Sequence, residues 1–246
     1  MPARKVAIIA EAEQGRIPSA ILDLAALAER LAENGSAEVL WIVVGSNAAD
    51  AGVALSGSTG YSAVALEIPC EVPPTGELLS QILQPFLEDM QPDVIALLHT
   101  SRSQDYAATL AIRLDAAFVS AVQGLLKKND GPIFQRAVLG GKYMAGVKVD
   151  DRPVVLTVLP GYFKFEGNGS HSAEMETQRP SLPVTRTRLI VIKESAAEAA
   201  LTQAATVVAA GRGIGSEDNL DLISRLADLF PKSAVAGSRI VCDAGW

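Results

Sequence analysis

Short apolar runs alternate with amphipathic segments along the first half of the chain. The runs are rich in Val, Ile and Ala and are bounded by turn residues, which is typical of buried parallel strands. We predict strands at residues 5–11, 38–44, 62–68, 94–98 and 118–122. Between the runs, apolar residues recur at steps of three and four, which predicts helices packed on a sheet. This alternation predicts a doubly wound parallel α/β sheet, with helices on both faces, over the first 125 residues.

Glycine, proline and hydroxyl residues mark the predicted ends of the helices. Ser19 is placed to cap the first helix, and Asn34-Gly35 to end it. Further helices are predicted from Gly45, over residues 76–90, and from a polar loop at 99–105 to about residue 114.

The pattern changes after Gly124. Three shorter runs, at residues 133–139, 143–149 and 154–158, are separated by turns at Gly140-Gly141 and Asp150-Asp151. They predict an antiparallel meander. The segment 160–186 has no periodicity and is rich in Gly, Ser, Pro and charge, so we expect a mobile loop there. We expect a strand at 188–192 and an interdomain connector at 194–201.

The last segment begins like an α/β phosphate-binding unit. We predict a strand at 206–210, a glycine turn at 211–215, a helix at 216–230 and a second strand at 234–238. Gly211 and Gly213 allow positive φ and let backbone N–H groups approach an anion, and Arg212 adds a charge that binds phosphate oxygens. The spacing departs from the dinucleotide fingerprint, and many such turns are purely structural.

Ser238 and Arg239 follow the second of these strands. Because the carboxyl ends of parallel strands share one edge of a sheet, Arg212 and Arg239 are expected to face the same crevice. Each arginine alone could equally be an ordinary surface residue.

The charge, cysteine and histidine content limits the classes of function that the chain could have. Over 246 residues the formal net charge is −7, which argues against general nucleic-acid binding. Cys70 and Cys242 are far apart and are expected to be reduced thiols. His99 and His171 have no partner at catalytic or metal spacing, although His99 ends a strand where ligands tend to bind; a hydrogen-bonded loop histidine is the favoured interpretation. Without a signal peptide or membrane span, the protein is expected to be soluble and cytoplasmic.

Several stretches resemble the α subunit of electron-transfer flavoproteins. The similarity is closest in VVAAGRGIGSEDNLDLISRLADLF and VAGSRIVCDAGW. That family has a strand, Gly-Arg-Gly and a helix here, followed by Gly-x-Ser-Arg-x-x-x-Asp-Ala-Gly-aromatic. The opening KVAIIAEAEQGRIPSAILDLAALAERL and the segment PDVIALLHTSRSQDYAATLAIRLDAAFVSAVQGL are also similar to the family.

The resemblance implies a two-domain α subunit that pairs with a β subunit. Residues 1–195 would form an adenine-nucleotide-hydrolase-like α/β domain that binds no flavin, and residues 196–246 a connector and the beginning of an FAD-binding domain. FAD would accept electrons from acyl-CoA dehydrogenases or other donors and pass them to an acceptor oxidoreductase. Arg212 would lie near the cofactor, and Ser238 and Arg239 would contact FAD. The protein would be an electron carrier and not the catalyst of its own substrate reaction.

The sequence departs from the family pattern at its end. Further FAD-binding segments that follow the Asp-Ala-Gly-aromatic motif in the family are not present before Trp246. A shortened fragment, a cleavage product or a natural short member that has lost FAD would each explain this, and the first two are favoured because the flavin-type residues are retained. The chain alone is not expected to hold FAD.

The alternative is a flavin-free module in which the first domain binds a nucleotide or acts as a scaffold. A nucleotide would lie at the strand ends near Ala10-Glu11 and at residues 99–105. A nucleotide hydrolase is disfavoured, because residues 11–15 replace the pyrophosphate loop expected after the first strand.

Overall fold

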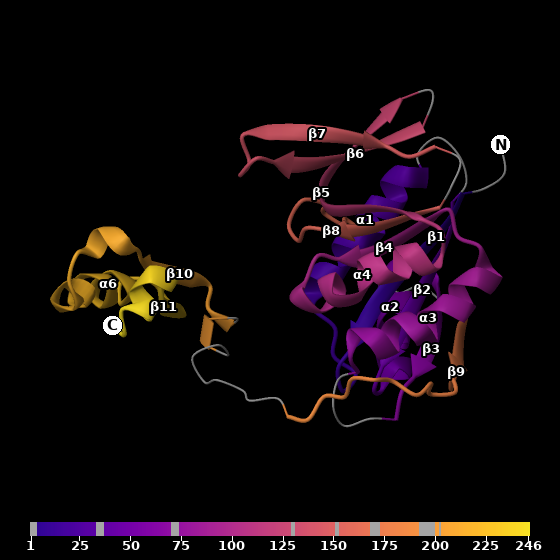
Figure 1. Cartoon of the computed structure of the whole chain (residues 1–246), viewed down its shortest axis with the longest axis horizontal. Coiled ribbons are helices and arrows are strands. Elements are labelled where there is room, and N and C mark those ends of the chain that lie inside the picture. The colour runs from indigo at the N-terminus through magenta and orange to yellow at the C-terminus, as the bar shows by residue number, and fades with distance from the viewer. Residues whose placement is uncertain are drawn as a thin grey trace. The chain divides into compact units, whose positions relative to one another are not determined.

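The chain forms two compact units, Met1–Ile190 and Val191–Trp246 (Figure 1). The computed structural model describes residues 4–32, 37–69, 74–128, 131–150, 153–167, 173–191, 200–201 and 203–246. Several predictions fall outside the described residues: the domain boundary at 195/196, residues 194–199 of the connector predicted at 194–201, the helix end at Asn34-Gly35, Cys70 and His171. The division at 195/196 stays a prediction.

The first unit is built on a nine-stranded sheet ordered β7-β6-β5-β8-β4-β1-β2-β3-β9. The strands are β1 Arg4–Ala12, β2 Ala37–Gly45, β3 Ser62–Glu67, β4 Val94–Leu98, β5 Ala117–Lys128, β6 Gly131–Val138, β7 Tyr143–Lys148, β8 Val154–Val158 and β9 Met175–Gln178. Strand β1 pairs in parallel with both β2 and β4, so the strand order reverses at β1/β4. Ligands of doubly wound sheets bind outside the carboxyl ends of the strands at such a reversal.

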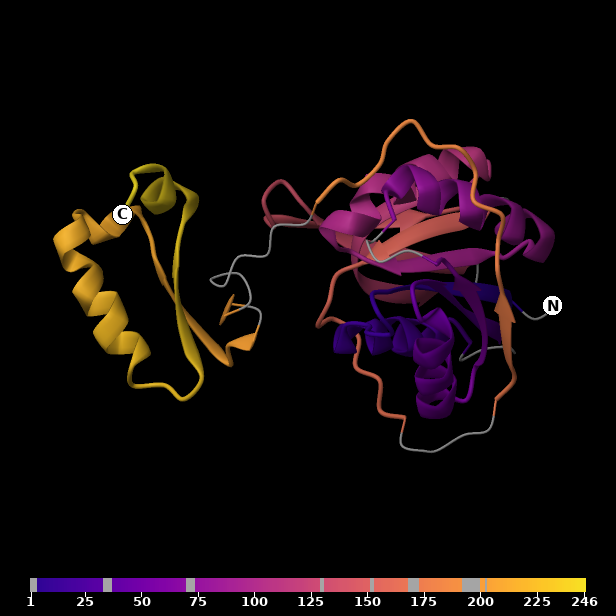
Figure 2. The same ribbon diagram turned by 90° about the horizontal axis from the view of Figure 1, so that it is seen from below.

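Helices cover both faces of the sheet, as predicted (Figure 2). They are α1 Leu22–Ala32, preceded by a 3-10 turn η1 Ser19–Ile21, α2 Ala48–Thr59, α3 Gly76–Met90 and α4 Ser101–Arg113. Helices α1 and α2 pack on one face against Val6, Ile8 and Ala10 of β1, and α3 and α4 pack on the other against Ala7 and Ile9. Side chains that alternate along β1 therefore contribute to two separate apolar cores, one on each face of the sheet.

The first four strands and α3 occur where the apolar pattern predicts them. Two helix starts are corrected. Ser19 does not cap α1, because it lies inside η1, whose N-cap is Pro18. Helix α4 begins at Ser101 and not after residue 105, because the Thr100 side chain accepts a hydrogen bond from the Ser103 N–H at 3.1 Å and so starts the helix early.

Strand β8 is not part of the meander that the sequence predicts. It inserts between β4 and β5 and pairs in parallel with both, and all five of its residues are buried. Its continuous apolar run is typical of a strand covered on both faces, and this favours the sheet interior over a hairpin. The meander instead consists of β5, β6 and β7, which pair antiparallel, with the Gly140-Gly141 turn between β6 and β7 as predicted.

The segment predicted as a loop contains ordered structure. Strand β9 pairs in parallel with β3, and Phe163 is fully buried in the core. Residues 188–191 form no strand, so that prediction is wrong for its described part. The preceding residues are attached to α3, because the Glu77 carboxylate accepts hydrogen bonds from the Thr187 hydroxyl at 2.8 Å and N–H at 3.0 Å and from the Arg186 N–H at 3.1 Å. We call this contact the Glu77 clamp.

The second unit is small. Its two strands, β10 Thr206–Ala210 and β11 Ser233–Gly237, pair in parallel. The predicted single helix at 216–230 is a 3-10 turn, η3 Glu217–Asn219, followed by the shorter helix α6 Leu220–Ala227. A further 3-10 turn, η2 Arg212–Ile214, lies in the glycine segment, and a short helix, α7 Arg239–Asp243, follows β11. None of the described helices is long and apolar enough to span a membrane.

Candidate functional site

The glycine segment directly after β10 forms a tight turn. Gly211 is extended, its carbonyl accepts the Ile214 N–H at 3.0 Å, and Gly215 has a φ of +78° that side-chain-bearing residues rarely adopt. The positions where a Cβ of Gly211 or Gly213 would lie are open. A ligand can therefore approach this backbone closely.

The second strand ends beside the first, as predicted. Ala210 is the register partner of Gly237, and the Ser238 N–H donates to the Ala210 carbonyl at 2.8 Å. Ser238 then becomes the N-cap residue of α7, so Arg239 lies in the first turn of that helix. The two segments, Gly211–Gly213 and Ser238-Arg239, thus share the carboxyl edge of this small sheet.

The charges at this edge are exposed. Arg239 Nε lies 3.4 Å from the Asp243 carboxylate in an i,i+4 pair whose two side chains are both open to solvent. Such a pair contributes little to stability and leaves the guanidinium available. The 3-10 turn η3 separates the glycine turn from the first residue of α6, Leu220, so the N-terminus of this helix does not follow the turn directly. The free thiol of Cys242, which the sequence predicts to be reduced, lies 3.7 Å from the Gly237 carbonyl.

At the β1/β4 reversal of the first unit, the crevice is occupied by side chains of the protein itself. Glu11, at the end of β1, accepts a hydrogen bond from the buried Tyr106 hydroxyl at 2.8 Å and lies 3.5 Å from Arg102 Nε. Arg102 also donates to Glu13 at 2.7 Å. Burial raises the pKa of Glu11, opposed by the Tyr106 hydrogen bond and the Arg102 charge, and burial raises that of Tyr106 well above its usual value. The negative charges of Glu11 and Glu13 would repel a phosphate group at this edge.

A second potential phosphate position, the N-terminus of α2, is also filled. The Glu67 carboxylate accepts the Asn47 N–H at 2.6 Å and the Ala49 N–H at 3.3 Å. These are the backbone donors that an anion at a helix N-terminus would use. A cavity of about 900 Å³ lies at the same edge, lined by Gln14, Ser46, Asn47, Glu67, Ile68, Pro69 and Arg179.

His99 is a hydrogen-bonded histidine at the end of β4, which confirms the favoured interpretation. Its Nδ1 lies 2.8 Å from the hydroxyl of Thr157, a fully buried residue that also accepts the Ala121 N–H at 3.1 Å. Burial and the nearby charge of Arg136 lower the pKa of His99. Among the described residues, no group of three or more His, Cys, Asp or Glu side chains could hold a metal ion.

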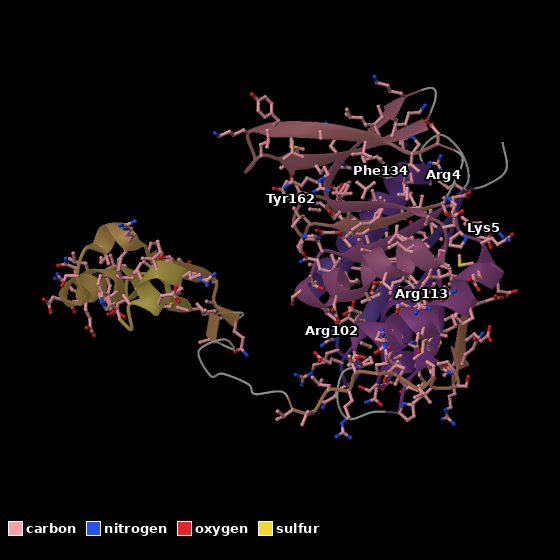
Figure 3. The ribbon with its side chains drawn as sticks, viewed as in Figure 1. Arg4, Lys5, Arg102, Arg113, Phe134 and Tyr162 are labelled. Carbon is pink, nitrogen blue, oxygen red and sulfur yellow. The ribbon has the colours of Figure 1, made fainter. Side chains whose placement is uncertain are left out.

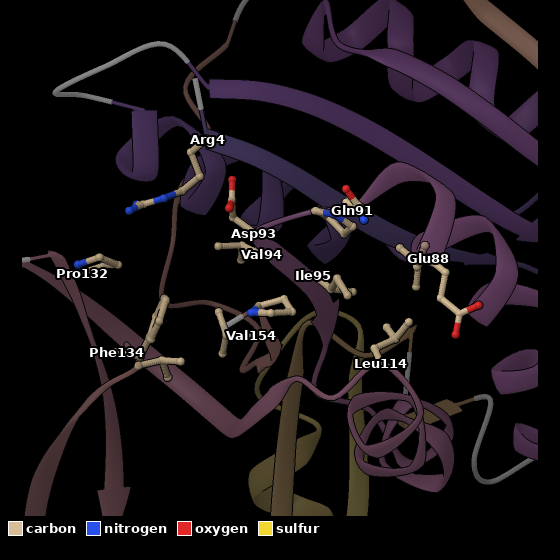
Figure 4. A pocket seen from close by; sticks show the side chains of 14 residues that line it. Arg4, Glu88, Gln91, Asp93, Val94, Ile95, Leu114, Pro132, Phe134 and Val154 are labelled. Atoms are coloured by element: carbon tan, nitrogen blue, oxygen red, sulfur yellow. The ribbon is translucent and has the colours of Figure 1, made fainter. Parts of the chain in front are cut away.

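One further cavity, of about 750 Å³, lies at the opposite, amino edge of the large sheet. Its walls include Arg4, Asp93, Leu114, Phe134 and Val154, which Figure 4 shows around the opening. Arg4 and Lys5 lie at the amino end of β1, and Figure 3 shows them toward the other end of the first unit from Arg102. Because ligands of parallel sheets bind at the carboxyl edge, this position does not favour a substrate site.

Comparison with known proteins decides the family. A family model described as the electron transfer flavoprotein domain matches residues 6–183, which is most of the chain. The chain belongs to the electron transfer flavoprotein family. A second model, described as the electron transfer flavoprotein FAD-binding domain, matches residues 200–246 and covers the glycine turn and Ser238-Arg239. The resemblance found in the sequence is thereby confirmed.

Curated relatives in this family are named electron transfer flavoprotein subunit alpha. The chain is 26% identical to that of Bacillus subtilis (strain 168) over 245 residues, which cover 99% of this chain and 74% of the relative. It is 30% identical to that of Syntrophomonas wolfei over 175 residues, 70% of this chain and 54% of the relative. It is 27% identical to the subunit of Methylophilus methylotrophus over 247 residues, which cover 98% of this chain and 75% of the relative.

Proposed function

We propose that the chain is the α subunit of an electron-transferring heterodimer, which holds FAD together with a β subunit. The observation that carries the proposal is the arrangement at the end of β10 and β11. There Gly211–Gly213 and Ser238-Arg239 lie side by side, within the segment that matches an FAD-binding domain. The donors would be acyl-CoA or other dehydrogenases, and the electrons would pass to an acceptor oxidoreductase.

The residues present fit a flavin nucleotide. The open backbone at Gly211 and Gly213 suits close approach of an anionic or planar group, and Arg212 and Arg239 supply two guanidinium groups. Bound FAD would supply the electron chemistry. The Arg239 charge and the Ser238 hydroxyl would contact the cofactor, and a guanidinium there would stabilise the anionic reduced form.

The second unit needs further protein around it to complete such a site. Val207 of β10 and Val235 of β11 are each 47% exposed, and Leu229 is 77% exposed. An isolated two-stranded sheet is marginally stable at best. We therefore expect residues 200–246 alone to hold FAD weakly, with the β subunit contributing to the complete site.

The test is to purify the natural polypeptide with its β subunit and record visible flavin absorbance before and after reduction. A yellow, reducible heterodimer is expected. The matched variants are Arg239→Leu and Arg225→Leu, because Arg225 forms a comparable exposed i,i+4 pair with Asp221 on α6. Arg239→Leu should weaken FAD binding by about ten- to hundredfold through the loss of a charged hydrogen bond, and Arg225→Leu should leave it unchanged. A colourless wild-type complex would refute the proposal.

The flavin-free nucleotide module receives less support. Its strand-end positions are occupied by the Glu11–Arg102–Glu13 pairs and by Glu67 on α2. Calorimetric titration of the chain with AMP, ATP and FAD separates the two functions, since tight AMP or ATP binding without flavin would favour the module.

A further inference from the structure

The cavity at the amino edge of the large sheet lies outside the segment that matches an FAD-binding domain. Its volume of about 750 Å³ is within the usual range of small-molecule pockets. Several elements that are far apart in sequence form its walls: the starts of β1, β4, β6 and β8 and the C-terminal ends of α3 and α4 (Figure 4). The cavity is therefore a product of the packed fold, present without a ligand.

The lining of this cavity is mainly apolar. Ten of its fourteen lining residues carry apolar side chains. Leu114 and Val149 are half-buried and keep apolar surface open to the cavity, and Phe134 is buried in its wall. Covering such surface with an apolar group is favourable, because it removes the surface from water.

Proline residues fix the backbone around the cavity. Pro92 directly precedes β4, Pro132 lies at the start of β6, and Pro153 directly precedes β8. A proline ring holds φ near one value and leaves no N–H group. The rim is therefore rigid and poor in backbone donors, so a ligand would bind without a large cost for ordering the chain.

Of the charged groups around the cavity, one has no partner in the described part of the chain. The Glu88 carboxylate accepts a hydrogen bond from the Gln84 side chain at 2.8 Å, and the Asp93 carboxylate accepts the Lys5 N–H at 2.8 Å. Arg4 makes no hydrogen bond or ion pair with a described residue, and Figure 4 shows Arg4 and Glu88 on opposite sides of the cavity. A guanidinium carries a permanent charge and five N–H donors, so Arg4 is the group that lacks an acceptor.

We propose that this cavity binds an amphipathic monocarboxylic acid, whose carboxylate pairs with Arg4 and whose apolar chain or ring lies against Leu114 and Val149. A carboxylate matches the planar fork of a guanidinium in two parallel hydrogen bonds. A small anion without an apolar body would leave the lining uncovered. An amine is disfavoured, because Glu88 and Asp93 already accept hydrogen bonds from the chain and Arg4 would repel it. The acid would be a ligand in addition to the proposed cofactor.

The experiment titrates the full chain by calorimetry with three ligands that share one apolar chain and differ in the head group: octanoate, octanol and octylammonium. Octanoate should bind saturably, with a Kd of about 0.1–1 mM for a ligand of this size. It should bind at least about tenfold more tightly than octylammonium, because its charge is opposite to that of Arg4. Acetate, which has the carboxylate without the chain, should show no saturable binding in the same concentration range.

Two variants test the two halves of the site. Arg4→Gln should weaken octanoate binding by about five- to twentyfold and leave octanol binding unchanged, because it removes the charge and keeps the apolar walls. The matched control is Arg16→Gln, an exposed arginine in the turn after β1, which should change octanoate binding by less than about twofold. Leu114→Trp should abolish binding of both octanoate and octanol, because the larger side chain fills the cavity. Its urea midpoint shows whether it folds, and the Arg4 and Arg16 pair decides the matter if it does not.

Methyl NMR spectra locate the bound ligand. Octanoate should shift the methyl signals of Leu114, Val149 and Val154, which line the cavity. The proposal is wrong if octanoate shows no saturable binding, if octylammonium binds more tightly than octanoate, or if Arg4→Gln binds octanoate as the wild type does. The flavin absorbance of the heterodimer with Arg4→Gln should equal that of the wild type, so failure of this site leaves the proposed function standing.

Discussion

Removing the Tyr106 hydroxyl tests the interpretation of the filled crevice. The hydroxyl donates to Glu11 at 2.8 Å, Tyr106 is 1% exposed, and the Glu11 carboxylate is itself largely buried. Tyr106→Phe deletes one hydrogen bond to a charged acceptor and leaves that acceptor desolvated. The expected cost is about 1.5–3 kcal/mol in free energy of unfolding at neutral pH and above.

The pH dependence gives the sharper signature. Burial raises the folded-state pKa of Glu11 above its ordinary value, so the folded state is favoured while the carboxyl is protonated and loses stability as pH rises through that pKa. Because the Tyr106 hydrogen bond opposes this shift, Tyr106→Phe should raise the pKa of Glu11 further and enlarge the loss. The difference between variant and wild type should therefore be larger at about pH 8 than at about pH 5.

Urea unfolding, followed by circular dichroism and tryptophan fluorescence at both pH values, measures this difference. Tyr61→Phe is the control, since it deletes the same atom from a half-buried tyrosine whose hydroxyl bonds to no carboxylate in the described part of the chain. A loss that is independent of pH, or equal in the two variants, would refute the assigned role of Glu11.

Three other substitutions probe the fold. Gly45→Ala should lower the free energy of unfolding by about 3 kcal/mol or more, measured in urea, because φ is +140° and the new Cβ would collide with the Ala12 carbonyl. Thr59→Val should cost about 1–3 kcal/mol, since Thr59 accepts the buried Trp41 Nε1–H at 2.9 Å; an unchanged urea midpoint would contradict this. Hydrogen bonds to the Glu77 carboxylate, the strongest of them from the Thr187 hydroxyl, lower the pKa of Glu77 to about 2. The stability that the Glu77 clamp contributes is therefore present above the ordinary pKa of 4.5 and is lost as pH falls toward 2. Glu77→Gln should abolish that dependence in hydrogen exchange of the two amides bonded by the clamp.

The sequence could predict much of the first unit because its signals are local. A buried parallel strand needs a continuous apolar run, and a helix on a sheet needs an apolar face, so β1 to β4 and α3 were found at nearly their observed bounds. Helix starts were less certain, because a few side-chain hydrogen bonds decide them. Thr100 and Ser103 show this at α4, which begins within the predicted polar loop.

Pairing between distant segments could not be predicted in the same way. The run 154–158 has the composition of an interior strand, yet nothing in its periodicity shows that it enters between β4 and β5. Strand β9 lies in a stretch with no apolar alternation and is stabilised by pairing with β3. Such contacts depend on the whole sheet, so local pattern does not reveal them.

The candidate sites likewise depend partly on local sequence motifs and partly on contacts between distant segments. The sequence by itself determined which residues follow β10 and β11 as candidates for cofactor binding, because Gly211–Gly213 and Ser238-Arg239 are short motifs directly after apolar runs. The same motifs indicated the family. The tertiary structure decided that the crevice at the β1/β4 reversal is closed, because Glu11, Arg102 and Tyr106 meet from segments about ninety residues apart. Motifs carry local chemistry, whereas occupancy and exposure depend on what the fold brings beside them.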